Sequence, residues 1–219
     1  MLDVIPRVYI YVISHDLGFS PNPFHGVCTL ACCKPIIRKK ARANDWIIGM
    51  GGTALRAVGR CIYAMRVSTS MSFDEYWAAD EFRVKRPTRN GSRKTMVGDN
   101  IYSRSDDQDD WKQQNSVHSQ PSGAQDDVNT IHDTSVNRVL VSDHFVYWGG
   151  NAPTINPSIL EEIGYRNGRG HRVFSFEQGA PLVDWVHEQV DGKFNRVLGD
   201  PFQFRMSDKR YSKDKNRLI

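Results

Sequence analysis

Apolar residues gather in short runs along the chain, and most of these runs have the period of β-strands. Residues 7–14 and 46–50 are apolar or aromatic at nearly every position, which is typical of strands buried on both faces of a sheet. Residues 59–69 alternate instead, with Cys61, Tyr63, Met65 and Val67 on one face. Similar patterns predict further strands over residues 27–33, 138–142, 143–148 and 173–176.

Helical patterns are fewer and shorter. Ser72 and Glu75 have the spacing of a capping box, so a short helix is predicted to begin there. Residues 157–163 start with a proline that suits a first helical turn, and residues 181–190 carry one apolar helical face. Together these elements predict a single α+β domain with short helices around a mixed, curved sheet.

Two polar segments interrupt or follow this pattern. Residues 104–137 are rich in Asp, Ser, Gln and Asn and contain few apolar residues, so we expect a long, mobile surface insertion there. Residues 205–219 form a basic tail that we expect to be frayed. The predicted domain therefore spans residues 1–204 and carries a flexible insertion.

Composition narrows the class of protein. Hydrophobic residues make up 39% of the 219 positions, which is enough for a real core, and no apolar run is long enough to cross a bilayer. The first residues do not resemble a secretory signal, and four cysteines, two of them adjacent, make a poor disulfide framework. We therefore expect reduced thiols and a cytoplasmic protein. The net charge of +4 permits a phosphate-bearing partner.

Eight short runs in the chain carry a resemblance to a known family. They are PNPFHG (21–26), CTLACCKP (28–35), IR (37–38), DWIIG (45–49), FDEYW (73–77), GDNIY (98–102), VSDHFVYWG (141–149) and GHR (170–172). This set resembles the nucleotide modification associated domain 2 family. The resemblance implies a setting in nucleobase modification, in phages, mobile elements or bacterial defence, with partner proteins of a modification system and no settled reaction.

A second resemblance concerns the sheet. Residues 45–49 followed by residues 62–67 look like the strand pair of PUA-like domains, the group that includes EVE, YTH and ASCH modules. This resemblance implies a barrel-like form of the curved sheet, with a pocket that accepts a single base. It carries no catalytic residue over to this chain.

The cysteine-rich stretch supplies the first candidate chemistry. His25, Cys28, Cys32 and Cys33 have residue types that zinc accepts, but Cys32 and Cys33 would point to opposite faces of a strand, so no metal site is predicted. The cysteines are then either buried structural thiols or include a nucleophile in Cys32 or Cys33. A nucleophile would need a base and cations nearby, which His25, Lys34 and Arg38 could supply.

Other candidate residues suit a nucleotide pocket. Asp143 and His144 are either an acid/base pair beside aromatic residues or a turn aspartate next to a core histidine. Basic and aromatic residues could bind phosphates and stack on bases. The candidate nucleotide-binding residues are Asn22, Lys34, Arg38, Trp46, Tyr76, Trp77, Asn100, Tyr102, Tyr147, Trp148, His171 and Arg172.

The favoured hypothesis is a protein that recognises a nucleobase or nucleotide, without a cofactor, in an aromatic and basic pocket. The alternative is an enzyme that modifies a nucleobase or nucleotide, with His25, Cys32, Cys33, Asp143 and His144 as catalytic candidates. A third hypothesis is an interaction subunit that acts only with partner proteins. Both pocket hypotheses predict one cavity bordered by the cysteine-rich stretch and by residues 143–148.

Overall fold

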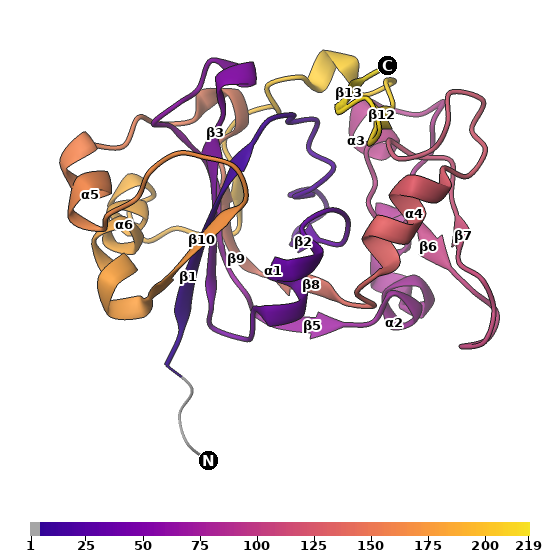
Figure 1. The fold of residues 1–219 in the computed structure, drawn as a ribbon, viewed down its shortest axis with the longest axis horizontal. Helices are drawn as coiled ribbons and strands as arrows, with labels where there is room; N and C mark the ends of the chain where they lie inside the picture. Colours follow the sequence, from indigo (N-terminus) through magenta and orange to yellow (C-terminus); the bar gives the residue numbers. More distant parts are fainter. Residues whose placement is uncertain (1–4) are drawn as a thin grey trace.

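A mixed six-stranded sheet forms the centre of the computed structural model, which describes residues 5–219 (Figure 1). The strand order is β10 (His171–Ser175), β1 (Arg7–Ile13), β3 (Trp46–Gly51), β4 (Cys61–Arg66), β9 (His144–Tyr147) and β11 (Arg196–Val197). β1 pairs with β3 and β9 pairs with β11 in parallel, and the other pairs are antiparallel. Because β10 and β11 are separate edges in the described residues, the sheet is not a closed barrel, and the PUA-like form is not confirmed.

The helices α5 (Pro157–Glu162) and α6 (Phe176–Gln189) cover one side of this sheet (Figure 1). α6 begins five residues before the predicted start at residue 181, because the Ser175 side chain caps it by accepting from the Gln178 N–H at 3.1 Å. Gly179 lets α6 approach β1 closely, since a Cβ there would lie 2.5 Å from Val8. The predicted strands 7–14, 46–50 and 59–69 correspond to β1, β3 and β4, which form the buried core.

A second, smaller layer lies on the other side. Its three-stranded sheet has the order β2 (Cys28–Leu30), β8 (Val139–Ser142) and β5 (Thr69–Met71). The capping box of Ser72 and Glu75 is present at the start of α2 as predicted. The remaining elements are α1 (Pro35–Lys40), η1 (Thr53–Leu55), α2 (Phe73–Ala78), η2 (Asp80–Lys85), α3 (Arg93–Met96), β6 (Tyr102–Ser103), β7 (Lys112–Gln113), α4 (Asp127–Thr134), η3 (Gly149–Asn151), η4 (Phe204–Met206), β12 (Tyr211–Ser212) and β13 (Arg217–Leu218).

The polar segment 104–137 lies at the surface only in part. It forms β7 and α4 and packs on the smaller layer, where His118, Asn129 and Asp133 are buried. The polar composition did not predict this burial, because polar side chains are usually exposed. Here each buried side chain has hydrogen-bond partners, which offset the cost of removing it from water. Part of the segment therefore belongs to the interior of the protein, while residues 105–110 are exposed.

The basic tail also differs from the frayed segment predicted over residues 205–219. It forms η4 and the antiparallel hairpin of β12 and β13. The Tyr211 N–H donates to the Val117 carbonyl at 2.7 Å, which ties the hairpin to the polar segment. None of the helices within residues 5–219 is long and apolar enough to cross a membrane.

Candidate functional site

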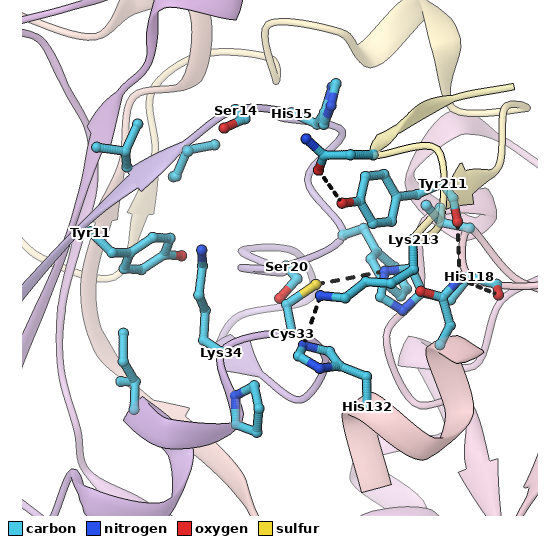
Figure 2. A pocket seen from close by; sticks show the side chains of 18 of the residues that line it. Tyr11, Ser14, His15, Ser20, Cys33, Lys34, His118, His132, Tyr211 and Lys213 are labelled. Atoms are coloured by element: carbon cyan, nitrogen blue, oxygen red, sulfur yellow. Dashed lines mark hydrogen bonds between the residues drawn. The ribbon is translucent and has the colours of Figure 1, made fainter. Parts of the chain in front are cut away.

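A cavity of about 420 Å³ lies between the end of β1 and the smaller layer (Figure 2). Its walls come from segments far apart in the sequence, including the turn before α1, the polar segment and the C-terminal hairpin. The lining residues are Tyr11, Val12, Ile13, Ser14, His15, Leu17, Phe19, Ser20, Cys33, Lys34, Pro35, Ile36, Ile37, Val117, His118, Asn129, His132, Arg169, Gly170, His171, Tyr211, Lys213, Asn216 and Leu218.

Cys33 occupies a turn, not the strand that the sequence predicts over residues 27–33. β2 ends at Leu30, and Cys33 and Lys34 both have left-handed backbone angles, with φ of 58° and 43°. Residues other than glycine hold this conformation only where the surrounding structure fixes it. Here the Cys33 N–H donates to Asp133 Oδ1 at 2.7 Å and its carbonyl accepts from Arg38 Nε at 2.9 Å. These bonds fix the half-buried thiol at the cavity wall.

The Cys33 thiol contacts a buried histidine and aspartate. Its Sγ lies 3.6 Å from His118 Nε2, and His118 Nδ1 lies 2.7 Å from Asp133 Oδ2. The Tyr102 hydroxyl donates to the same carboxylate oxygen at 2.9 Å. Because the carboxylate can only accept, Nδ1 carries a proton and Nε2 faces the sulfur. Thiol, imidazole and carboxylate thus form one hydrogen-bonded chain, the geometry in which a base activates a nucleophile.

The electrostatics of the pair favour a charged imidazole. Burial alone lowers the pKa of His118, but the carboxylate of Asp133 and the sulfur of Cys33 outweigh burial and raise it above the ordinary value. Burial raises the pKa of Asp133, and the positive charges of His118 and Arg38 more than offset this and lower it. Asp133 can therefore stabilise the imidazolium that forms when His118 takes a proton from Cys33.

Arg38, predicted to bind a nucleotide, instead holds this site together. Its side chain is fully buried and its guanidinium donates to the carbonyls of Cys33, Asp133, Val136 and Arg138. Because every one of these acceptors is backbone, Arg38 joins the cysteine turn to the end of α4. Arg38 is therefore a positioning residue that has no donor directed into the cavity.

Three predicted site residues meet at the cavity, namely Cys33, Lys34 and His171. Cys32 lies behind them, fully buried, and burial together with nearby carboxylates raises the pKa of its thiol well above the ordinary value. Tyr102 contributes indirectly through Asp133. The candidate nucleophile is thus Cys33, and its candidate base is His118 in place of the predicted His25.

The other predicted nucleotide-binding residues lie outside the cavity. Asn22, Tyr76 and Asn100 donate or accept hydrogen bonds within the buried interior of the smaller layer. Trp46, Tyr147 and Trp148 belong to the core of the main layer. Trp77 lies under the Arg86 guanidinium, 3.8 Å from its ring centroid, and Arg172 is exposed. These placements give the residues structural roles, since buried aromatic and amide side chains pack and pair with their neighbours.

The sequence predicts one cavity shared by the cysteine-rich stretch and residues 143–148, but the structure has two separate cavities here. The large cavity contains no residue of that segment. A second, smaller cavity of about 250 Å³ brings His25 and Asp143 together. His144 lies elsewhere, with its ring stacked at 3.9 Å on Phe194, and burial and the nearby charges of Arg66 and His187 lower its pKa to about 4. Asp143 and His144 therefore do not form one acid/base pair.

One group in the described residues has the donor atoms for a metal ion. The ligand atoms of Cys32, His118 and Asp133 all lie within 4.8 Å of one another. A zinc ion would need a deprotonated Cys32 and a carboxylate oxygen of Asp133, which already accepts from His118, Tyr102 and the Cys33 N–H. The buried thiol and the existing hydrogen bond therefore favour the acid/base role of His118 over ligation.

Sequence analysis did not find His118, Asp133, Lys213 or Tyr211. All four belong to the polar segment or the tail, which were set aside because they lack apolar residues. No local signal sets His118 and Asp133 apart, because the same segment contains other aspartates and a second histidine, His132. Their pairing with Cys33 depends on tertiary contacts that no local pattern encodes.

Fold and site together define an α+β protein with a basic cavity and a cysteine paired to a buried histidine and aspartate. The sequence profile described as Nucleotide modification associated domain 2 matches residues 5–208, and the chain belongs to this family. The match ends before the hairpin of β12 and β13. No curated protein and no solved structure matches the chain.

Proposed function

We propose that this protein is an enzyme that modifies a nucleotide or nucleobase, with Cys33 as nucleophile and His118 as its base. The observation that carries the proposal is the hydrogen-bonded chain from Cys33 Sγ through His118 to Asp133, at the wall of a cavity of about 420 Å³. Ligand cavities of this kind usually measure about 300 to 1,000 Å³. Membership of a family associated with nucleotide modification supports the choice of substrate.

The proposed step conserves atoms and charge. His118 Nε2 takes the proton of Cys33 Sγ, and the sulfur forms a bond to an electrophilic carbon of the substrate as the bond to a leaving group breaks. The imidazolium then gives its proton to the departing group, and water later cleaves the sulfur–carbon bond. Asp133 stabilises the imidazolium throughout and keeps Nε2 directed at the sulfur.

The wider setting is part of the same proposal. The family match supports a role connected with nucleotide modification. We propose a DNA-modification or phage-defence system, with partner proteins, as the setting of this role. The favoured hypothesis from sequence, recognition without reaction, also needs a cavity but gives no function to the Cys33–His118 pair. For this reason we place the enzyme first and make recognition an outcome of the test.

The first experiment follows alkylation of the four cysteines by iodoacetamide, with peptide mass spectrometry. Burial alone favours Cys33, because the other three thiols are fully buried. The informative comparison is therefore between the Cys33 alkylation rates of two variants. His118→Asn should slow this alkylation at least tenfold, and His132→Asn should leave its rate unchanged. His132 lines the same cavity but has no bond to the cysteine, so it is the matched control. Equal rates in both variants would contradict a Cys33–His118 pair.

The second experiment incubates the protein with nucleosides and nucleotides and analyses them by mass spectrometry. Conversion by the natural sequence and none by Cys33→Ser is the expected result. Binding of a nucleotide that stays unchanged in the presence of a reactive Cys33 would overturn the enzyme and support recognition.

A further inference from the structure

Positively charged side chains gather in the lining of the cavity. Lys34, Arg169 and Lys213 line it together with four histidines, and no aspartate or glutamate is among the lining residues of the described chain. The two lysines come from opposite walls, Lys34 from the turn before α1 and Lys213 from the C-terminal hairpin (Figure 2). Like charges that converge in one cavity repel each other unless an anion lies between them.

Neither lysine has an acidic partner. Within the described residues, the Lys34 ammonium has no hydrogen-bond acceptor and lies 4.5 Å from the centroid of the Tyr11 ring. Burial lowers its pKa, and the opposing effects of Cys33, which raises it, and of Lys213, which lowers it, leave it below the ordinary value. The Lys213 ammonium lies 3.2 Å from His132 Nε2, and burial with the neighbouring cations lowers the pKa of that imidazole. A neutral His132 accepts this hydrogen bond and leaves the positive charge of Lys213 uncompensated.

The hairpin that carries Lys213 is fastened over the cavity. Besides the bond from its N–H to Val117, Tyr211 accepts from Asn129 Nδ2 at 3.0 Å through its carbonyl and donates from its hydroxyl to Asn216 at 2.8 Å. Its ring lies 5.7 Å from that of His118. The hairpin therefore forms a wall of the cavity directly beside the Cys33–His118 pair.

We propose that Lys213, together with Lys34, forms a phosphate subsite, so that the ligand of the cavity is a free mononucleotide. This inference rests on the proposed function and adds the substrate class. Ammonium groups bind phosphate through charge-assisted hydrogen bonds. A cavity of about 420 Å³ with the hairpin as one wall suits a single nucleotide, whereas base and sugar alone would leave the two ammonium groups without an anion. Lys34 lies within the part of the chain that matches the family and Lys213 lies beyond residue 208, so the match covers only one of the two ammonium groups.

The test measures binding to the full chain by calorimetry. The probes are AMP, CMP, GMP, UMP and their deoxy forms, each nucleoside without phosphate, and a 5′-phosphorylated single-stranded decamer. At least one monophosphate should bind about 10- to 100-fold more tightly than its nucleoside, as expected for one or two charge-assisted hydrogen bonds. Lys213→Met should remove this preference, while Lys213→Arg should keep most of it.

Lys215→Met is the matched control, because Lys215 belongs to the same hairpin but is exposed and does not line the cavity. Circular dichroism and nucleoside affinity report whether Lys213→Met keeps its fold, and Lys34→Met tests the opposite wall independently. Nucleosides that bind as tightly as monophosphates would overturn the subsite, and a decamer that binds more tightly than every monophosphate would overturn the mononucleotide. Neither result bears on the Cys33 alkylation test, which uses no nucleotide, so the two proposals fail separately.

Discussion

Replacement of Asp133 by asparagine should damage both the stability of the fold and the reactivity of Cys33. The carboxylate is fully buried and accepts three hydrogen bonds, from the Cys33 N–H at 2.7 Å, His118 Nδ1 at 2.7 Å and the Tyr102 hydroxyl at 2.9 Å. Asparagine has nearly the same shape but only one acceptor oxygen. The NH₂ group of asparagine must therefore face either the Cys33 N–H or the two donors on His118 and Tyr102. Asparagine is also neutral, so the buried imidazolium of His118 loses its negatively charged partner.

The expected loss of stability is large. Removing one partner of a buried ion pair typically costs about 3 to 5 kcal/mol, against a total stability of about 5 to 15 kcal/mol for a native protein. At about 2 to 4 °C per kcal/mol for a chain of this size, Asp133→Asn should lower Tm by about 6 to 20 °C. Alkylation of Cys33 should slow by about 100-fold, the lower end of what a positioned base contributes.

The assay combines thermal unfolding by circular dichroism with the alkylation rate of Cys33 at a temperature where the variant is folded. Asp99→Asn is the control, because Asp99 is also fully buried and accepts from Thr29 at 2.6 Å and Tyr76 at 2.8 Å, in a separate network. That variant should lose stability and keep the Cys33 rate. A folded Asp133→Asn protein that alkylates at the natural rate would refute the role given to Asp133.

Three further predictions concern the scaffold. Lys85→Met should lower the free energy of unfolding in urea by about 3 to 5 kcal/mol, because the buried ammonium donates to Asn22, Val27 and Thr29 at 2.8 to 3.1 Å. A loss as small as that of the exposed Lys94→Met would contradict this prediction. The pKa of His144 is about 4 in the folded protein and about 6.5 in the unfolded chain, so between these values the unfolded chain binds the proton more readily. The stability that His144 contributes is therefore fully present above about pH 6.5 and is lost as pH falls toward 4. His144→Phe should reduce this acid-dependent fall of Tm, and an identical fall would exclude His144 as its source. Ser72→Ala should cost about 1 kcal/mol by removing the cap of α2, whereas Ser72→Asp should restore most of it; an unchanged Tm in Ser72→Ala would show that the cap adds nothing.

The predictable part of the fold is the part in which local pattern and burial agree. Strands β1, β3 and β4 are apolar because both of their faces are covered, so their sequences show their position directly. The capping box at Ser72 is similarly local, since both of its hydrogen bonds lie within one helical turn. Neither feature needs knowledge of a distant segment.

The candidate site was predictable only in part, because most of it depends on distant pairing. Cys33 and Lys34 were found from residue type, but the base was assigned to His25, which is close in sequence and exposed in the structure. His118 is 85 residues from Cys33 and lies in a segment that composition marks as a surface insertion. Hydropathy measures apolar burial and takes no account of polar side chains that satisfy one another, so this segment was misjudged.

The position of Asp133 explains why this polar segment has to be ordered if Cys33 is to react. One carboxylate oxygen fixes the Cys33 backbone in its left-handed turn, and the other directs His118 at the thiol. The thiol and the imidazole are therefore aligned by one side chain. Arg38 in turn fixes this arrangement by donating to the backbone carbonyls of Cys33 and Asp133. A displacement of α4 would move the base and release the cysteine turn at once. It follows that Arg38→Met should slow the alkylation of Cys33 although Arg38 does not line the cavity. A substitution that only enlarges the cavity should leave the alkylation rate of Cys33 unchanged.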